Sequence, residues 1–388
     1  MKIIALLISL FVYLQLKAQV TKVGNDTLLD IACWNIEWFG NTQSGPTNEP
    51  LQFTNVKSVF TNTDIDVWGL CELANPATFT ALLSAIPAYD GVNSTFSLTQ
   101  KMGMIWKKSM FDLVSSQNLP DANNFDFASR KPLEVILKTK NTPIIDTLYF
   151  YVVHLKANES SSDVASYNRR KASIEWLKAF IDQNRKGKKV LILGDWNDDI
   201  DESVITIGGQ NTASPFLSMV NDSNKYFFPS MRLSKAGLTT YPTFNPPNMI
   251  DHICNAYGLK DSFYIKESAL VLSQLGTQIT NFINTTSDHY PVLGRYNFNR
   301  YPKQTPVGIA AINQPIQIGV YPNPASTILN VECNMPIVKV VLLNRLGITL
   351  ELAITYNMID ISQVPDGVYI LEIQTKEGSG ILKIVVRH

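Results

Sequence analysis

Three of the four histidines in this chain of 388 residues lie in or beside short polar segments, each set at or just after an apolar run. They are His154, His252 and His289, whereas the fourth, His388, is the last residue. Imidazole titrates near neutral pH and can take up or release a proton during a reaction. The concentration of histidine in these segments therefore indicates chemistry rather than packing.

The same polar segments contain residues suited to bind a metal ion and to orient a nucleophile. Glu72 and Asp288 offer the hard oxygen ligands that Mg²⁺, Mn²⁺ or Ca²⁺ prefers. Asp195 and Asn197 are separated by one residue, so their side chains lie on the same face of an extended segment. The carboxylate accepts protons, and the amide can also donate a hydrogen bond.

A carboxylate and an imidazole complete the set of reactive groups. Asp251 could hold His289, which would fix the tautomer of the ring and raise its basicity. Hydrolysis of a phosphodiester needs charge neutralised on the phosphoryl oxygens, together with a positioned nucleophile and a proton carrier. These residues therefore indicate metal-dependent hydrolysis of a phosphodiester.

Apolar runs and helical spacing predict how the chain positions these residues. A helix is predicted at 50–60 and a longer one at 165–184, where Ile174, Leu177 and Ile181 share one stripe. Strands are predicted at 28–34, 65–70, 102–106, 133–137, 148–153 and 190–193. Because polar segments repeatedly follow strands, we expect an α/β domain whose site lies at one edge of its sheets.

Six of the polar segments, in their order along the chain, resemble the motifs of the endonuclease/exonuclease/phosphatase superfamily. They are Trp34-Asn35-Ile36-Glu37, Gly69-Leu70-Cys71-Glu72, His154-Leu155-Lys156, Gly194-Asp195-Trp196-Asn197, Ile250-Asp251-His252 and Ser287-Asp288-His289. This superfamily includes deoxyribonuclease-I-like nucleases, sphingomyelinases and inositol-phosphate phosphatases. The resemblance covers a catalytic domain at 28–299 and implies a four-layer α/β/β/α sandwich.

The resemblance also implies a role for the residues that would bind the metal ion, the phosphate and the water. Asn35 and Glu72 would hold the metal ion, expected to be Mg²⁺ or Mn²⁺, and the scissile phosphate. Asp288 would be a second ligand of the metal ion or of water. Asp195 and Asn197 would orient the attacking water.

Proton transfer would fall to two of the histidines. Asp251 and His289 would form a catalytic dyad, and His154 would protonate or stabilise the leaving oxygen. His252 stands where the superfamily usually has an aromatic residue, so we expect it to pack rather than to react. Glu37 replaces an aspartate or arginine that is often found at its position, and its role is left open.

Basic residues favour a nucleic-acid substrate. Arg130 matches a phosphate-contacting arginine of the nuclease branches, and Lys156 belongs to a run that resembles a signature of secreted bacterial nucleases. Residues 101–171 contain 11 Lys+Arg against 7 Asp+Glu, although the whole chain has a formal net charge of +0. A basic lip beside the site would bind a phosphate backbone without reading its sequence. We therefore expect a nonspecific endonuclease.

Other functions stay open. A phosphatase or a sphingomyelinase-like phosphodiesterase would use the same site. A lipid enzyme should expose an apolar hairpin for membrane docking, and residues 226–229 are a weak candidate. A catalytically inactive surface-binding module is the alternative from a different class, but one intact set of residues argues against it: Glu72, Asp195, Asn197, Asp251 and His289.

The first residues are typical of a signal peptide at 1–18. Lys2 precedes an apolar run at 3–16, and Ala18 offers a small residue for cleavage. The alternative is an uncleaved membrane anchor, for which this run is short. We expect a mature monomer with no stable insertion in a membrane.

The character of the sequence changes near residue 300. A linker is predicted at 300–317, where Pro302, Pro306 and Pro315 interrupt any hydrophobic period. Short apolar runs separated by turn residues then predict a small all-β sandwich at 318–388. Its strands are predicted at 328–331, 338–343, 350–354, 368–373 and 381–386.

This last segment resembles the C-terminal sorting domain of the type IX secretion system of Bacteroidota. The matching runs are Val320-Tyr321-Pro322-Asn323-Pro324-Ala325, Asp366-Gly367-Val368-Tyr369-Ile370 and Lys383-Ile384-Val385-Val386. The resemblance implies an immunoglobulin-like sandwich that the secretion machinery recognises, export through the periplasm, and a secreted or cell-surface location. A carbohydrate-binding or adhesive β-module is the alternative, although no clustered aromatic platform is evident in the sequence.

Overall fold

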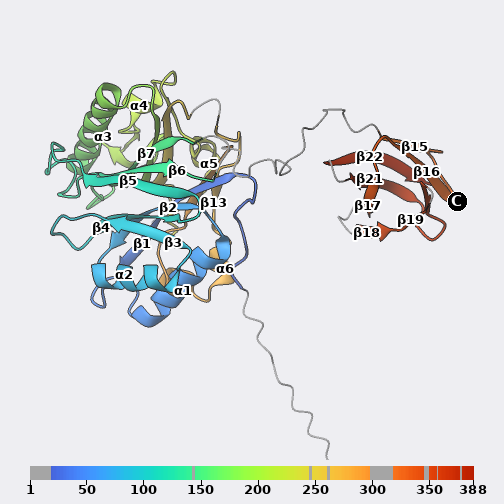
Figure 1. The fold of residues 1–388 in the computed structure, drawn as a ribbon. Coiled ribbons are helices and arrows are strands. Elements are labelled where there is room, and N and C mark those ends of the chain that lie inside the picture. Colours follow the sequence, from blue (N-terminus) through green and yellow to red (C-terminus); the bar gives the residue numbers. More distant parts are fainter. Residues whose placement is uncertain are drawn as a thin grey trace, which may run out of the picture. The chain divides into compact units, whose positions relative to one another are not determined.

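The computed structural model describes residues 19–141, 145–243, 247–259, 263–297, 318–344, 349–355, 357–375 and 378–388. These residues form two compact units, one up to residue 297 and one from residue 318 (Figure 1). The predicted signal peptide at 1–18 and the whole predicted linker at 300–317 lie outside the described residues. In the part of the chain that is described, no helix combines the length and apolar character needed to cross a membrane.

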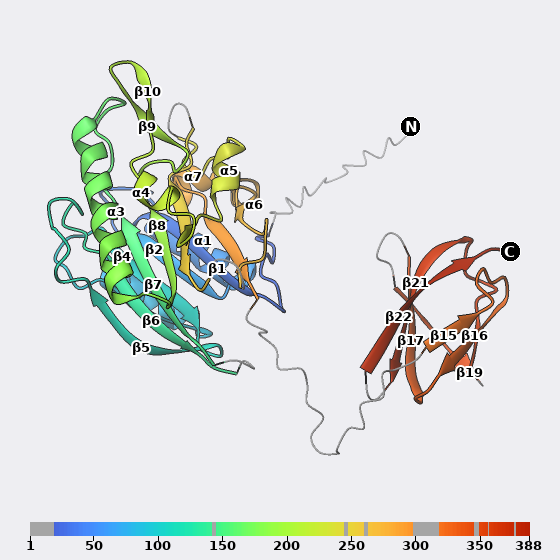
Figure 2. The ribbon, with the colours of Figure 1, turned by 90° about the horizontal axis from the view of Figure 1, so that it is seen from above.

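The larger unit is built on two six-stranded sheets that pack face to face (Figure 1). In spatial order, the first sheet contains β13 (Leu270–Val271), β14 (Val292–Tyr296), β1 (Leu29–Phe39), β2 (Val67–Leu73), β4 (Lys101–Lys107) and β3 (Tyr89–Asn93). The second contains β11 (Tyr226–Phe227), β12 (Asp251–Tyr257), β8 (Lys189–Asp195), β7 (Thr147–His154), β6 (Leu133–Thr139) and β5 (Phe111–Asn118). A separate hairpin, visible in Figure 2, is formed by β9 (Glu202–Ile207) and β10 (Gln210–Ala213).

Helices cover the outer face of each sheet. The first sheet is covered by α1 (Glu49–Thr63), α2 (Pro76–Ala85), α6 (Leu275–Gln278) and α7 (Phe282–Thr285). The second sheet is covered by α3 (Val164–Asn184) and α4 (Leu217–Val220), and a further short helix is α5 (Met231–Lys235). The order helix, sheet, sheet, helix confirms the predicted four-layer α/β/β/α sandwich.

Each long helix begins at a residue that caps it. The side chain of Asp163 accepts a hydrogen bond from the backbone N–H of Ser166 at the start of α3. Asn48 and Asn75 do the same for α1 and α2, and each is followed within two residues by proline. These caps satisfy backbone donors that a helix leaves unpaired at its N-terminus. Helix α3 therefore starts close to its predicted position.

The smaller unit is an all-β domain of two four-stranded sheets, which confirms the predicted fold class (Figure 2). One sheet contains β15 (Ile318–Tyr321), β16 (Ile328–Cys333), β20 (Met358–Asp360) and β19 (Ile354–Thr355). The other contains β18 (Thr349–Leu352), β17 (Ile337–Leu343), β21 (Gly367–Thr375) and β22 (Gly378–Val386). The strand predicted at 350–354 is in fact two strands, because the chain passes from one sheet to the other at Ala353. The immunoglobulin-like detail stays a prediction.

Candidate active site

The alternation of side chains along β1 directs Asn35 into the space between the two sheets. Ile31 and Cys33 pack between the sheets, whereas Ala32 and Trp34 pack on the helical side of the first sheet. Successive side chains of a strand point to opposite faces, so Asn35 continues the inner series. Asn35 follows the last apolar side chain of this inner series, so the inward-facing position at the edge of the apolar core holds an amide.

The second sheet repeats this arrangement on three neighbouring strands. The inner series of β7 and β8 end in His154 and Asp195, and the inner series of β12 begins with Asp251. Strand pairing places His154 and Asp251 on either side of Asp195. Nε2 of His154 lies 3.5 Å from Oδ2 of Asp195. Three residues that are far apart in sequence are therefore neighbours because of register.

Gly194 makes the close pairing of β7 and β8 sterically feasible next to Asp195. Its φ angle is 136°, and a Cβ added to it would lie 2.1 Å from the carbonyl oxygen of Val153. Only glycine tolerates both conditions. The glycine that precedes Asp195 is therefore required by the backbone that presents the carboxylate.

Glu72 reaches the same space by a different route. Cys71 belongs to the inner series of β2, so a regular strand would turn the next side chain outward. Glu72 instead has a φ angle of 64°, and the register of β2 shifts beside it. Its Oε2 accepts a hydrogen bond from the backbone N–H of Trp38, and its Oε1 accepts one from Nε2 of Gln100. Irregular strand geometry of this kind is frequent at functional sites.

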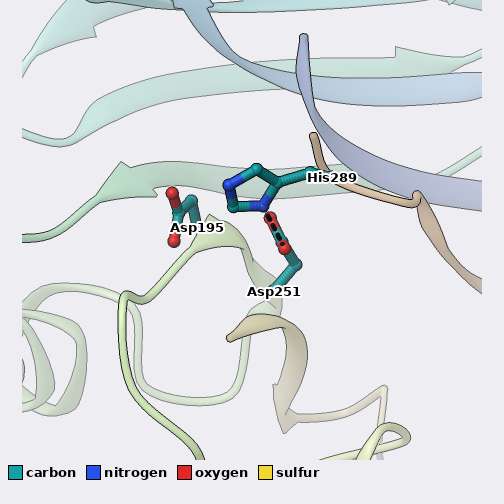
Figure 3. A group of neighbouring side chains, drawn as sticks. All are labelled: Asp195, Asp251 and His289. Atoms are coloured by element: carbon teal, nitrogen blue, oxygen red, sulfur yellow. Dashed lines mark hydrogen bonds and ion pairs between the residues drawn. The ribbon is translucent and has the colours of Figure 1, made fainter. Parts of the chain in front are cut away.

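The loop before β14 supplies His289. Oγ of Ser287 donates a hydrogen bond to the carbonyl oxygen of Asn35 at 2.6 Å and accepts one from the backbone N–H of His289 at 3.0 Å. Nδ1 of His289 lies 2.7 Å from Oδ2 of Asp251. Figure 3 shows the Asp195 carboxylate on the side of the imidazole opposite Asp251. The second ring nitrogen of His289 is therefore turned toward the space that holds Asp195.

Burial and charge set the protonation of this cluster. Burial alone would lower the pKa of His289, but the Asp251 carboxylate raises it well above its usual value. Burial, reinforced by Asp251, raises the pKa of Asp195 to about 7. Burial and the nearby Arg130 guanidinium lower the pKa of His154 well below its usual value. At neutral pH the cluster thus holds a charged His289, a neutral His154 and an Asp195 close to its titration point.

Asp195 is tied to both neighbouring segments of the site. Its Oδ1 accepts a hydrogen bond from the backbone N–H of Asn197 at 2.9 Å, and its Oδ2 accepts one from Nδ2 of Asn35 at 3.0 Å. Asn197 has a φ angle of 54° and donates from Nδ2 to the carbonyl oxygen of Leu155. The Asp195 carboxylate is therefore held by one backbone N–H and by the side-chain amide of Asn35, and the Asn197 amide is held by a backbone carbonyl.

These side chains surround a cleft of about 480 Å³. All the predicted site residues line it except Asp251, which is fully buried behind His289: the lining members are Asn35, Glu72, Arg130, His154, Lys156, Asp195, Asn197, Asp288 and His289. The structure thus brings together every residue that the sequence analysis singled out for the site. Their roles stay predictions.

The predicted basic lip is only partly present. Arg170 is fully buried and binds Asp198, with Nη2 at 2.7 Å from Oδ2. Arg130 is also buried and donates to the carbonyl oxygens of His154 and Leu155. Both guanidinium groups therefore hold the walls of the cleft. Lys156 retains a partly exposed ammonium on the cleft.

Sequence reasoning missed several residues of the cleft. Gln100 donates to Glu72 and accepts a hydrogen bond from Nη1 of Arg130, so it connects both. The ring of Tyr241 lies 4.7 Å from that of His289. Gln100 directly precedes β4, the neighbour of β2, so strand register could have located it. No signal in the sequence distinguishes Tyr241 from the other tyrosines.

Residues 32–289 match the model of the Endonuclease/Exonuclease/phosphatase family. The chain belongs to this family. Members of the family are hydrolases of phosphodiester bonds that typically use divalent metal ions. Residues 319–387 match the model of a Secretion system C-terminal sorting domain, which indicates export to the cell surface or beyond. No protein of curated function matches the chain in sequence.

Solved structures of the family share the fold of the larger unit. TDP2 of D. rerio, complexed with a single-strand DNA product, is 15% identical, with a TM-score of 0.52 over 70% of this chain and 100% of that chain. An endonuclease/exonuclease/phosphatase from Bacteroides vulgatus is 16% identical, with a TM-score of 0.51 over 70% of this chain and 99% of that chain. At these identities, the similarity concerns the fold alone.

The charges of the cleft fit the divalent metal ion that the family uses. Burial raises the pKa of Glu72 and Asp288, and burial with the Asp288 charge raises the pKa of Glu37 to about 8. The side chains of Glu37, Glu72, Asp195 and Asp288 thus line one cleft, and a divalent cation bound among these carboxyl groups would favour their charged forms. Ligand atoms of Asp195, Asp251 and His289 lie within 4.8 Å of one another, so this second set could hold a metal ion if His289 lost its proton (Figure 3).

Proposed function

We propose that this protein is an exported, metal-dependent phosphodiesterase that cleaves nucleic acid internally and without sequence preference. The observation that carries the proposal is the contact between His289 and Asp251, at 2.7 Å, in a cleft that also holds Asp195, Asn197 and Glu72. Hydrolysis of a phosphodiester requires a group that activates water and a charged donor that stabilises the phosphoryl oxygens. The Asp195 carboxylate and the His289–Asp251 ion pair can supply these two functions.

Water activation would fall to Asp195 and Asn197. A pKa of about 7 makes Asp195 a suitable general base at neutral pH, because the base should have a pKa near the working pH. Its two oxygens are already held by Asn35 and by the backbone of Asn197. The carboxylate can therefore accept a proton from a water without first having to be positioned.

Stabilisation of the phosphoryl group would fall to His289. Nδ1 of the ring is engaged by Asp251, so Nε2 is the nitrogen available to donate a hydrogen bond into the cleft. The raised pKa keeps this imidazolium charged, and a charged donor suits the negative charge that develops on the phosphoryl oxygens. A divalent ion held by Glu72, Asn35 and Asp288 would polarise the same phosphate as a Lewis acid.

His154 would act on the leaving oxygen. The lowered pKa keeps its imidazole neutral at pH 7, so the ring can donate one hydrogen bond without carrying charge. Its Nε2 lies 3.7 Å from Oε1 of Glu72 and 3.5 Å from Oδ2 of Asp195. The ring is therefore placed between the carboxylate assigned to the metal ion and the one assigned to water.

Charge and surface favour a nucleic-acid diester over the alternatives. The acidic groups of the cleft suit a monoanionic diester better than a dianionic monoester. Tyr226 and Phe228, the weak candidate for a membrane-docking hairpin, are buried. The β9–β10 hairpin turns at Gly208 and Gly209, and Ile207 is the only large apolar side chain that its described residues expose, which is little for insertion in lipid. The bound DNA product of the related TDP2 structure adds support.

A panel of substrates tests this proposal. The purified mature protein would be incubated with Mg²⁺ or Mn²⁺ and with supercoiled plasmid, RNA, sphingomyelin or a phosphomonoester. We expect nicking and then linearisation of plasmid, which EDTA abolishes. Release of phosphocholine or of inorganic phosphate, with intact plasmid, would contradict the nuclease assignment and favour the lipid phosphodiesterase or the phosphatase.

A further inference from the structure

Phe125 is an exposed aromatic side chain that the fold holds in place. The side chain is 68% exposed, the largest value among the large apolar residues described in the catalytic unit. Its backbone N–H donates to Oδ1 of Asn123 at 2.8 Å, and its carbonyl oxygen accepts the N–H of Ala128 at 3.1 Å. Burial does not explain this position, because the ring faces solvent while its backbone is fixed.

Arg169 of α3 packs on this ring. The guanidinium carbon lies 4.4 Å from the ring centroid of Phe125, a cation–π contact. Nε and Nη2 of Arg169 both donate to the carbonyl oxygen of Phe125. Within the described residues, no group accepts a hydrogen bond from Nη1. The pair therefore presents an aromatic surface beside a positive charge with a free donor edge.

The Phe125–Arg169 pair shares a wall with the catalytic cleft. Ala128, which hydrogen-bonds to Phe125, lines that cleft together with Arg130. Phe127 anchors the connecting turn in the core, where its ring lies 5.8 Å from that of Trp176. The backbone N–H of Arg130 donates to the carbonyl oxygen of Phe127 at 2.8 Å, so the segment that carries Phe125 continues directly into the wall of the cleft.

We infer that Phe125 and Arg169 form a platform on which an unpaired base of the substrate stacks while the adjacent backbone enters the cleft. This inference rests on the proposed nuclease function and names its substrate class as single-stranded nucleic acid. Aromatic rings bind bases of any sequence by stacking, and an adjacent arginine binds the phosphate. A duplex offers no free base face, so the platform favours single-stranded or frayed substrates.

Binding of a fluorescent single-stranded oligothymidylate to the full chain in EDTA tests the platform without hydrolysis. Phe125→Ala should weaken binding by on the order of tenfold, and Phe125→Leu should do the same, since leucine is apolar but has no π face. Phe125→Trp should restore binding. Leu113→Ala, an exposed apolar residue at the distant end of β5, is the control and should bind as the wild type does. Wild-type affinity in Phe125→Leu would overturn the inference.

Hydrolysis of bis(p-nitrophenyl) phosphate with Mn²⁺ separates the platform from the proposed function. We expect Phe125→Ala to lower the ratio of kcat/KM for the oligonucleotide to kcat/KM for this small diester by about tenfold. If the wild type does not hydrolyse the diester but oligonucleotide binding still depends on Phe125, the proposed function fails and the platform stands. If the diester is hydrolysed and the ratio is unchanged, the platform is wrong and the proposed function stands.

Discussion

Asp195 and Asp251 occupy paired positions on the antiparallel strands β8 and β12, so two carboxylates face the same buried space. Neither is exposed by more than 2%. Two like charges at such a position repel each other, and burial with the Asp251 charge raises the pKa of Asp195 to about 7. The charged His289 beside Asp251 offsets part of this repulsion. The two paired carboxylates therefore differ in role: Asp251 holds the His289 imidazolium, and Asp195 can accept a proton.

Glu72 is predicted to set the metal dependence of the enzyme. Glu72→Gln keeps the shape of the side chain and its hydrogen bond from Trp38, but it removes the charge that would attract a divalent ion. We expect a higher Mn²⁺ concentration for half-maximal activity and weaker Mn²⁺ binding by calorimetry. Glu159→Gln, which changes an exposed carboxylate that pairs with Lys156, is the control. Unchanged Mn²⁺ affinity in Glu72→Gln would contradict the assignment of Glu72 as a ligand and would indicate that other carboxylates of the cleft bind the metal ion.

Arg170 is predicted to stabilise the fold rather than to bind substrate. Its guanidinium and Asp198 are both fully buried, so Arg170→Met would leave an unpaired buried charge. The free energy of unfolding should fall by about 3–5 kcal/mol in urea titrations. Lys171→Met, which removes the exposed charge next in sequence, should leave it nearly unchanged. An Arg170→Met protein that is as stable as the wild type but binds DNA weakly would contradict this prediction and would support a role of Arg170 in the predicted basic lip.

Asp182 is predicted to stabilise the protein in a defined pH range. Burial would raise its pKa, but hydrogen bonds from Lys178, Tyr257 and Tyr226 outweigh it and lower the pKa to about 2. A lowered pKa stabilises the fold above the unfolded value near 4, and this contribution is lost as the pH falls from about 4 to 2. Asp182→Asn should lower the free energy of unfolding at pH 7 by on the order of 2 kcal/mol. In this variant, the free energy of unfolding should also depend less on pH between about 4 and 2. Asp112→Asn, at an exposed ion pair, is the control.

The smaller unit is predicted to be dispensable for hydrolysis. All the residues assigned to the site lie in the larger unit, so a chain that ends at residue 299 should retain metal-dependent activity. In the native host, the same truncation should leave the protein in the periplasm, because the sorting domain is missing. Activity is measured on plasmid, and location by fractionation. Release of the truncated protein into the medium would contradict the role in sorting.

Much of the fold follows from local patterns in the sequence. The inner series of β7 and β8 are apolar until His154 and Asp195, so strand ends predicted from hydrophobicity also locate polar residues between the sheets. Helix α3 follows from its apolar stripe and its cap at Asp163. These features depend on neighbours in sequence, which the chain itself displays.

The remaining features depend on contacts between distant segments. Glu72 turns inward only because β2 is irregular, and a non-glycine residue with positive φ carries no local signal. Gln100 and Tyr241 enter the cleft through strand pairing and loop packing. Arg170 lies in the segment that predicts a basic lip, but its guanidinium is buried against Asp198, which is 28 positions away in sequence. Contacts between segments distant in sequence determine where each of these residues lies, and local sequence patterns do not show such contacts.

The most direct test of the account is the turnover of plasmid by His289→Ala. Loss of this imidazolium should lower kcat by about 10²–10⁴-fold with Mg²⁺ at neutral pH, while thermal unfolding shows a folded protein. His388→Ala, which removes the exposed histidine at the C-terminus, should retain the wild-type kcat. A folded His289→Ala protein that nicks plasmid at the wild-type rate would contradict the assignment of catalysis to the Asp251–His289 pair.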